Sequence, residues 1–405
     1  MYKRSWIEID TKTIKNNYDI YKANIKSNLS VMAVVKADAY GHGDIETASI
    51  LEKAGCEDFA VSNISEAIKL REGGIKGQIL ILGYTDPEAA DKLYEYDITQ
   101  ALLSEEYAEK LKTCFGKYKN AADRENSGED HPEKGVDKEL KIQCLRDSVG
   151  SRTENGSDKK LKVQWAIDTG MNRIGLDGSR PEVCEEIIRD SLKNFNVTGI
   201  FTHLCVADTP SEETFTNSQI ASFKKVAESI ADLELPYVHC LNSAGGLWAE
   251  SYGSMVRLGI ILYGLKPDMA NTLPEGIKPA LSWKSVVSMV KKVYPGESIG
   301  YGRTFKAEKE MTVATISTGY ADGFNRALSN KGRIIFNGIT LPIVGRVCMD
   351  QFMVDATNAE GISQGSEVIL LGEGYDADEM GKDAGTIGYE IVCDISKRVD
   401  RKYLY

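Results

Sequence analysis

Several absences narrow what this 405-residue chain can be. It has only four histidines, and its eight cysteines are scattered with no Cys-x-x-Cys pair, so neither a zinc site nor a disulfide framework is expected. No apolar run approaches the roughly 20 residues that a membrane-spanning helix needs, and the N-terminus lacks the apolar core of a signal peptide. We therefore expect a cytoplasmic protein with reduced thiols, no metal site and no membrane partner.

An excess of positive charge is also missing. The chain has 49 basic and 60 acidic residues and a net charge of -11, which argues against electrostatic binding to nucleic acid. Its length suffices for two domains, or for one barrel with an added domain.

The most informative stretch is Val31-Met-Ala-Val-Val-Lys-Ala-Asp-Ala-Tyr-Gly-His-Gly43. Its apolar, β-branched first half predicts a buried strand, which ends on Lys36 and a glycine-containing turn. At the carboxyl end of a buried strand, partial desolvation would favour the neutral amine of Lys36 and suit it to Schiff-base chemistry or proton abstraction. This segment alone is equally compatible with a lysine whose side chain reaches solvent.

A strand-then-helix pattern extends from this stretch. A first helix, capped by Asp10, is predicted from Thr11 to about Ile25. The strands are expected at 31–36, 58–62, 78–83, 98–103, 163–168, 197–203, 237–242 and 255–263, and the helices between them at 44–54, 65–72, 87–95, 105–114, 181–193 and 212–232. Eight such strands predict an α/β fold, a TIM-type (β/α)8 barrel in which the loops after the strands carry the chemistry. A doubly wound open sheet is the alternative, but the first strand lacks the G-x-G-x-x-G spacing of a dinucleotide fold.

Two segments depart from this pattern. Residues 115–160 are dense in charged and polar residues and predict a solvated insertion, for which disorder is one interpretation; His131 within it is not expected to take part in chemistry. From about residue 275 onward, short alternating runs with glycine turns predict a mostly-β domain, with strands at 281–290, 311–316, 333–336 and 367–371. The predicted domains are therefore 1–274 and 275–405.

In the barrel, polar residues collect just after the strands. They are Lys36 and Tyr40, Asp168 to Arg173, His203, and Asn242 with Ser243, while Arg257 lies within the last strand. Such convergence on one face is what a site requires, although His203 alone would more often be a core histidine. Asn242 and Ser243 could form only a helix cap, or bind a phosphate with the same groups. A guanidinium in an apolar strand needs a partner.

The second domain places three tyrosines beside glycine or in glycine-containing turns, at Tyr301, Tyr320 and Tyr389. Such tyrosines often only pack on the backbone. A phenol transfers protons near neutral pH only where a nearby cation lowers its pKa from about 10.

Taken together, four motifs resemble the alanine racemase family of fold-type III pyridoxal-phosphate enzymes. They are Val35-Lys-Ala-Asp-Ala-Tyr-Gly-His-Gly43, Asp168-Thr-Gly-Met-Asn-Arg-Ile-Gly175, Tyr301-Gly302 and Gly345-Arg-Val-Cys-Met-Asp-Gln351, in the family's order. The resemblance covers nearly the whole chain except 115–160. It implies a homodimer with shared active sites that uses pyridoxal 5'-phosphate to interconvert L-alanine and D-alanine, supplying D-alanine for peptidoglycan.

The resemblance also assigns roles to single residues. Lys36 would bind the cofactor covalently and act as the base for the D enantiomer, and Tyr301, reaching in from the partner subunit beside His203, would be the base for the L enantiomer. Arg257 would face the pyridine nitrogen, Arg173 would bind the cofactor's phenolic oxygen and the substrate carboxylate, and Met349 would meet the substrate across the dimer. The residues implied around the cofactor phosphate are Tyr40, Ser243 with its neighbour Asn242, Gly259, Ile260 and Tyr389.

One position departs from the family's pattern. Many members carry a carbamylated lysine two residues before the Asp-Thr-Gly, where this chain has Ala166. Alanine cannot supply a negative charge, so we hypothesise that a bound anion orients Arg173. Serine racemisation, a fold-type III decarboxylase and a non-catalytic pyridoxal-phosphate carrier are the alternative functions. Arg257 disfavours the decarboxylase, and the second domain disfavours the single-barrel carrier.

Overall fold

The computed structural model describes residues 4–126, 160–268 and 270–405 and divides into two compact units. The barrel unit comprises Lys22–Ala37 and Asp44–Gly259, and the β unit comprises Met1–Tyr21, Asp38–Gly43 and Ile260–Tyr405. The chain therefore enters the β unit, crosses into the barrel unit and returns. The predicted domain boundary near residue 275 stays a prediction. The division into compact units is a different one, because it groups the first strand with the C-terminal part of the chain.

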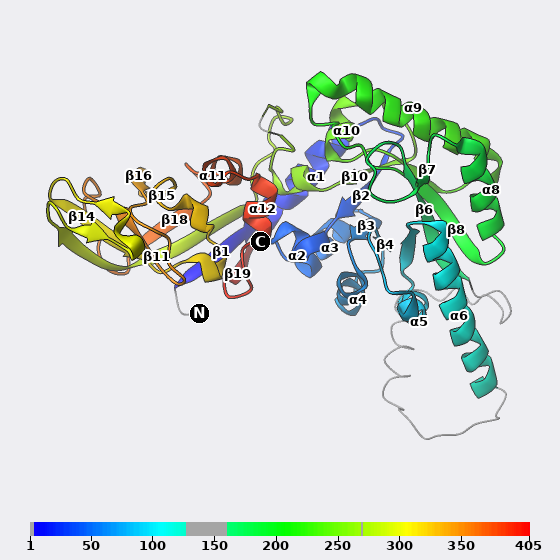
Figure 1. The fold of residues 1–405 in the computed structure, drawn as a ribbon, viewed down its shortest axis with the longest axis horizontal. Helices are drawn as coiled ribbons and strands as arrows, with labels where there is room; N and C mark the ends of the chain where they lie inside the picture. Colours follow the sequence, from blue (N-terminus) through cyan, green and yellow to red (C-terminus); the bar gives the residue numbers. More distant parts are fainter. Residues whose placement is uncertain (1–3, 127–159, 269) are drawn as a thin grey trace. The chain divides into compact units, whose positions relative to one another are not determined.

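The barrel unit contains a sheet of parallel strands, most of which are labelled in Figure 1. Their order in the sheet is β10-β2-β3-β4-β5-β6-β8-β9. A parallel bridge between Leu241 and Val256 brings the two edge strands together and nearly closes the barrel, which confirms the predicted fold. The strands are β2 (Ser30–Val34), β3 (Asp58–Val61), β4 (Gln78–Ile81), β5 (Thr99–Leu102), β6 (Leu161–Asp168), β8 (Phe195–Phe201), β9 (Tyr237–His239) and β10 (Met255–Leu258), with a short β7 (Leu176–Asp177) beside β6.

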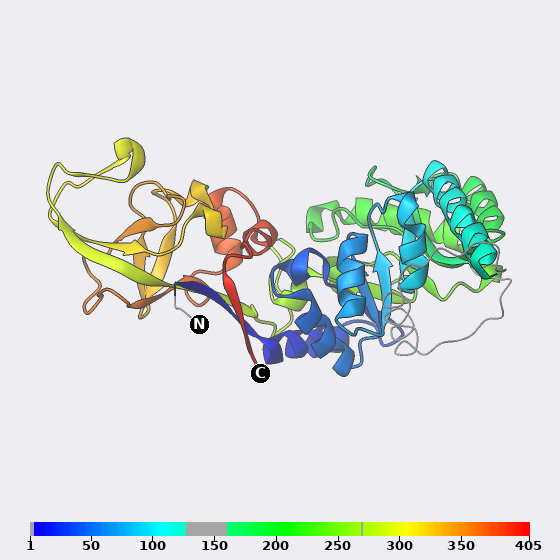
Figure 2. The same cartoon turned by 90° about the horizontal axis from the view of Figure 1, so that it is seen from below.

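Helices alternate with these strands along the chain (Figures 1 and 2). They are α3 (Asp44–Lys53), α4 (Ile64–Glu72), α5 (Ala90–Glu95), α6 (Glu105–Asn126), α8 (Pro181–Ser191), α9 (Glu213–Ser229) and α10 (Ser243–Trp248). Helices α3, α4, α5, α8 and α9 each bury apolar residues, as parallel sheets of this class require on their outer face. The strands are buried on both sides, and β3 and β5 have no exposed residue.

Three predictions about the ends of strands and helices need correction. Helix α6 continues to Asn126 rather than ending at residue 114, because Phe115 is buried and its ring contacts Tyr94 and Tyr118. Strand β10 ends at Leu258, and Ile260–Tyr263 form a buried 3-10 turn instead of a longer strand. Strand β2 ends at Val34, so Lys36 begins a helical turn and is not the last residue of a strand. The rest of the predicted insertion, with His131, lies outside the described residues.

The β unit is built on a sheet in the order β16-β15-β18-β11-β1-β19, with β14 and β17 added through β11. Its strands are β1 (Ser5–Asp10), β11 (Leu281–Val293), β14 (Met311–Ile316), β15 (Arg333–Phe336), β16 (Ile339–Pro342), β17 (Phe352–Asp355), β18 (Glu367–Leu371) and β19 (Asp400–Leu404), and β12 (Ser298–Ile299) pairs with β13 (Phe305–Lys306). The four strands predicted from the sequence are confirmed as β11, β14, β15 and β18.

Both ends of the described chain join this sheet. Strand β1 pairs antiparallel with β11 and parallel with β19, and it buries Trp6, Ile7 and Ile9. Helix α1 (Thr11–Asn24) follows directly, and the Asp10 carboxylate accepts the backbone N–H groups of Lys12 and Thr13 at 2.9 and 3.1 Å, as the predicted cap requires. The β unit also holds α11 (Ala377–Ala384) and α12 (Gly388–Cys393).

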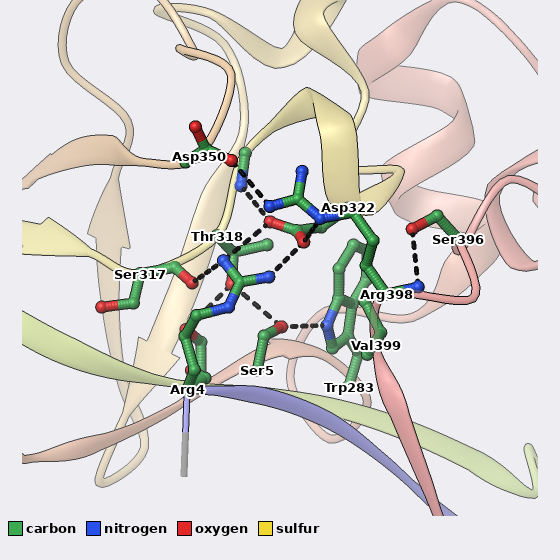
Figure 3. Close-up of polar contacts among 12 residues, drawn as sticks. Arg4, Ser5, Trp283, Ser317, Thr318, Asp322, Asp350, Ser396, Arg398 and Val399 are labelled. Carbon is green, nitrogen blue, oxygen red and sulfur yellow. Dashed lines mark hydrogen bonds and ion pairs between the residues drawn. The ribbon is translucent and has the colours of Figure 1, made fainter. Parts of the chain in front are cut away.

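A buried carboxylate ties four segments of the β unit together (Figure 3). Asp322 has a fully buried side chain; it forms an ion pair with Arg4 and lies 3.6 Å from the Nε of Arg398. Its second oxygen accepts the Gly319 N–H at 3.0 Å, and its backbone carbonyl accepts the N–H of Ser396 at 3.0 Å. Arg398 also donates to the exposed Asp350 at 2.8 Å, so the start of β1, the 319–323 turn, the 350 loop and the segment before β19 share one polar network.

Candidate active site

The central group of the barrel unit is Arg257 on β10. Its side chain is buried, and Nη1 donates to Nδ1 of His239 at 2.6 Å while Nη2 donates to the Thr202 carbonyl at 2.6 Å. Nη2 also lies 3.3 Å from Nδ1 of His203. The prediction that this guanidinium needs partners is therefore confirmed, and its partners are neutral acceptors rather than a carboxylate.

These contacts set the tautomer of His239. Because Nδ1 accepts from Arg257, Nε2 must carry the proton that it donates to Oε1 of Gln164 at 2.8 Å. Burial, and then the Arg257 charge, hold the pKa of His239 well below its ordinary value. Burial also lowers the pKa of Arg257 to about 10, so at neutral pH a neutral imidazole supports a charged guanidinium.

His203 lies directly after β8, among three cations. Burial lowers its pKa most, and the charges of Arg257, Arg173 and Lys36 lower it further, so the imidazole is neutral. These residues come from three strand ends and one strand, and the structure brings together what the sequence predicted to converge. A cluster of fixed positive charge around a neutral imidazole favours an anionic ligand.

The loop after β6 is shaped by Asp168. One carboxylate oxygen accepts the N–H groups of Gly170 and Asn172 at 2.9 and 3.0 Å, and Asn172 adopts a left-handed φ of 56°. This turn presents Arg173, which is exposed. Within the described part of the chain, no side chain forms an ion pair with Arg173.

Ala166, on the strand before this loop, has an apolar environment. It is buried in a cluster with Ala101 and Phe201, and Leu82, Leu103 and Ile174 pack against that cluster. The position therefore offers no carboxylate that could orient the guanidinium.

Helix α10 begins at the predicted turn. The Asn242 side chain accepts the Gly245 N–H at 2.8 Å, which confirms the helix cap. The Ser243 hydroxyl accepts the Gly259 N–H at 2.7 Å, so the start of α10 and the end of β10 are held side by side. The phosphate role of Ser243, Gly259 and Ile260 stays a prediction.

Lys36 begins the short helix α2 (Lys36–Tyr40), whose backbone is unusual. Ala37, Asp38, Ala39 and Tyr40 have φ values of 53°, 56°, 53° and 53°, a left-handed turn made entirely of residues with side chains. Single residues of this kind are uncommon, and each costs about 1 kcal/mol or more. At its start, the Ala37 N–H donates to the Glu66 carboxylate at 2.8 Å, and Lys36 itself is half-buried.

At the end of α2, Tyr40 belongs to an aromatic cluster of the β unit. Its ring centroid lies 5.0 Å from that of Tyr263 and 6.2 Å from that of Tyr389 on α12. Tyr40 is 8% exposed, and burial raises the pKa of its phenol well above the ordinary value. The next residue must be glycine, because a Cβ at Gly41 would lie 2.2 Å from the Val392 carbonyl oxygen.

Two predicted site residues of the β unit are exposed. Tyr301 is 71% exposed and opens the turn Tyr301–Arg303 between β12 and β13; Met349 is 53% exposed. The Met349 backbone is fixed, since its carbonyl accepts the Ala321 N–H at 3.0 Å and approaches Gly319 too closely for any Cβ there. Asp322, buried in the network of Figure 3, fixes the same 319–323 turn.

Comparison with known proteins agrees with this geometry. The alanine racemase N-terminal domain matches residues 9–124 and 136–267, and the alanine racemase C-terminal domain matches 280–403. The alanine racemase of Halothermothrix orenii is 36% identical over 98% of this chain and 96% of its own length. The chain belongs to the alanine racemase family. The alanine racemase of Methanococcus maripaludis is also 36% identical, over 99% of this chain and 98% of its own.

Solved alanine racemase structures share the fold. That of Clostridium difficile 630 aligns with a TM-score of 0.84 at 33% identity and covers 100% of this chain and 96% of its own. That of Bartonella henselae, described with covalently bound pyridoxal phosphate, has a TM-score of 0.80 at 29% identity and full coverage of both chains.

Some residues of the site were not found by sequence reasoning. They are His239, which bonds Arg257, Gln164, which bonds His239, and Glu66, which accepts a hydrogen bond from Ala37 in α2. All three contacts join residues far apart in the sequence. The one available signal was His239, a histidine inside an apolar strand.

In the described ranges, no cluster of three or more His, Cys, Asp or Glu is placed to hold a metal, and no helix has the length and apolar character to span a membrane.

Proposed function

We propose that this alanine racemase family member interconverts L-alanine and D-alanine with pyridoxal 5'-phosphate as cofactor, as a homodimer whose active sites are shared. Full-length similarity to alanine racemases supports the reaction. The structural observation that carries it is the charge arrangement around His203, in which Lys36, Arg173 and Arg257 surround a neutral imidazole. This arrangement suits a dianionic phosphate ester and an amino-acid carboxylate.

The residues present fit the cofactor. Lys36 offers an amine for the aldehyde, Arg257 is proposed to direct an N–H of its buried guanidinium at the ring nitrogen, and Ser243, Gly259, Ile260, Tyr40 and Tyr389 are proposed for the phosphate. When bound, the cofactor draws electrons from the substrate's α-carbon and so acidifies its proton. Arg257 donates but cannot accept a proton, and its partners His239 and the Thr202 carbonyl hold it in place, so the ring nitrogen beside it would stay unprotonated.

Racemisation requires proton transfer on both faces of the α-carbon. A single base would usually return the proton to the face from which it came, so two bases are needed. We assign Lys36 to the D enantiomer and the partner subunit's Tyr301 to the L enantiomer. The exposure of Tyr301 and Met349 within one chain supports this assignment, because side chains that serve a second subunit should be unburied in the first.

The orientation of Arg173 is the least typical part of the site. Ala166 and its apolar neighbours supply no charge, so we propose that a small anion such as chloride sits beside Arg173 and orients it toward the substrate carboxylate. The KM for alanine should then fall as chloride replaces a bulky anion at constant ionic strength. A KM that does not respond to chloride would contradict this proposal.

Serine is the alternative substrate, since an apolar pocket rejects an added hydroxyl only weakly, by about 1 to 3 kcal/mol. Tyr389 is proposed to narrow the pocket in favour of alanine. We propose that the protein acts in the cytoplasm and that its role there is to supply D-alanine for peptidoglycan.

The direct test is isotope exchange. Purified protein with pyridoxal 5'-phosphate in D2O should incorporate deuterium at the α-carbon of both L- and D-alanine and bring the two to equal concentrations. Carbon dioxide release would instead indicate a decarboxylase, faster turnover of L-serine would indicate a serine racemase, and cofactor binding without exchange would indicate a carrier.

A further inference from the structure

The left-handed turn α2 needs an anchor at its end, and His42 supplies one. The His42 side chain is 1% exposed, and its Nδ1 lies 3.1 Å from the Ala39 carbonyl oxygen and 2.8 Å from that of Tyr40. Carbonyls only accept, so Nδ1 carries a proton and donates it to both. One imidazole N–H therefore holds the last two carbonyls of a backbone turn that is unfavourable for residues with side chains.

The other ring nitrogen fixes the charge of His42. Nε2 is buried and has no hydrogen-bond partner among the described residues. The ring lies tilted against that of Tyr263, with the two centroids 4.6 Å apart, and it lines a cavity of about 10 Å³, hardly room for one water molecule. Burial lowers the pKa of His42 to about 4: it outweighs the hydrogen bonds to the Tyr40 and Ala39 carbonyls and the Asp38 charge, which raise the pKa, and the Arg401 charge lowers it further. A neutral ring with a fixed tautomer is thus built into the turn.

A second side chain holds the residue between Tyr40 and His42. Arg401 on β19 donates from Nε to the Gly41 carbonyl at 3.0 Å and lies 3.5 Å from the Asp38 carboxylate. His42 and Arg401 therefore hold successive backbone carbonyls from Ala39 to Gly41. Tyr263 lies against both His42 and Tyr40, so displacing the imidazole would also release one face of the Tyr40 ring.

We infer that His42 is a positioning residue that fixes the phenol of Tyr40 for the phosphate of the cofactor. This inference rests on the proposed function only in the statement that Tyr40 contacts the phosphate. His42 does not touch the reacting atoms. Its effect should therefore appear in the affinity for a phosphorylated cofactor, and not in the affinity for the same aldehyde without phosphate.

The test compares pyridoxal 5'-phosphate with pyridoxal as ligands of the apoenzyme, using tryptophan fluorescence and visible absorbance. His42→Phe keeps a buried aromatic ring but removes the donor, while His42→Asn can place an amide N–H near the Nδ1 position. We expect the phenylalanine variant to bind pyridoxal 5'-phosphate about tenfold more weakly, with pyridoxal binding unchanged, and the asparagine variant to recover most of the loss. Ser285→Ala, which removes a buried hydroxyl of the network around Thr318, should leave the ratio of the two affinities at its wild-type value.

Equal weakening toward both ligands, or an unchanged ratio in His42→Phe, would overturn the inference. If that variant does not fold, Arg401→Gln removes the neighbouring anchor, and the same loss of selectivity for the phosphate is expected. Racemisation of alanine is measured separately. A wild-type protein that selects the phosphorylated ligand but does not racemise alanine would contradict the proposed function and leave the role of His42 intact.

Discussion

The two units prepare their parts of the site differently. In the barrel unit, Arg257, His239 and Gln164 are buried and satisfy one another within one chain. In the β unit, the Met349 backbone and the 319–323 turn are rigidly held, but the Tyr301 and Met349 side chains are 71% and 53% exposed. The difference supports our proposal that one chain supplies the charges around the cofactor by itself, whereas the proposed second base, Tyr301, serves a neighbouring subunit.

The largest effect is expected at the barrel's own base. Lys36→Ala removes the residue that we propose as both covalent anchor of the cofactor and base for the D enantiomer, and we expect racemisation to fall more than about a thousandfold. The visible absorbance of covalently bound cofactor should disappear while the far-UV circular dichroism stays the same. Residual activity within tenfold of wild type would mean that the barrel unit does not carry the reaction as we describe.

Loss of the proposed second base, Tyr301, should lower racemisation without the loss of cofactor absorbance expected for Lys36→Ala. Tyr301→Phe removes one hydroxyl that is not buried in its own chain, so neither cofactor absorbance nor thermal stability should change. Racemisation should fall by about 10²- to 10³-fold, with a larger deuterium isotope effect in the direction that starts from L-alanine. Unchanged racemisation would remove the second base from our account.

The rigid support beneath the exposed residues can be tested through Asp322. Asp322→Asn leaves Arg4 and Arg398 without their buried carboxylate, and because both arginines are partly solvated we expect a loss of about 2 kcal/mol in the free energy of unfolding. The KM for alanine should rise with it, since the turn beside Met349 loosens.

Asp350→Asn is the matched control for Asp322. Asp350 is exposed and bonds the same Arg398, so its replacement should cost less than about 1 kcal/mol. Denaturant unfolding followed by fluorescence measures both variants, and equal losses would show that burial of Asp322 does not matter.

Acid should weaken the folded protein through its buried histidines. The pKa of His42 is lowered from 6.5 to about 4, and those of His203 and His239 are also lowered, so the unfolded chain binds protons more readily. Stability is therefore intact above pH 6.5 and falls as the pH drops below it, for His42 by about 3 kcal/mol by pH 4. Urea midpoints between pH 8 and 4 measure this fall, and His42→Asn should flatten part of it.

The sequence predicted the barrel because its signals are local. Local patterns revealed the alternation of apolar strands with helices and the polar residues that follow the strands. Arg257 was singled out because its neighbours in the sequence are apolar. The strand that pairs with both β11 and β19 was not readable, because β1 is paired with residues about 280 and 390 positions away. A domain boundary placed at one position in the sequence cannot assign an N-terminal strand to a C-terminal sheet.

Single-residue surroundings were equally hard to predict. The left-handed turn from Ala37 to Tyr40 contradicts the local preferences of its residues. It is held by the nearby His42 and, from distant parts of the chain, by Glu66 and Arg401. Helix α6 is longer than predicted because Phe115 packs against aromatic side chains. The mostly polar composition of residues 115–160 gave no indication of this packing. In both cases tertiary contacts outweighed the local pattern.

Subunit mixing tests the central claim most directly. Lys36→Ala and Tyr301→Phe protomers, each nearly inactive, are unfolded together, refolded with pyridoxal 5'-phosphate and assayed for alanine racemisation. If each site takes its lysine from one chain and its tyrosine from another, half of the dimers are mixed and each has one intact site, so about a quarter of wild-type activity should return. If activity stays at the level of the two separate variants, Lys36 and Tyr301 act within one chain or not together, and the account is contradicted.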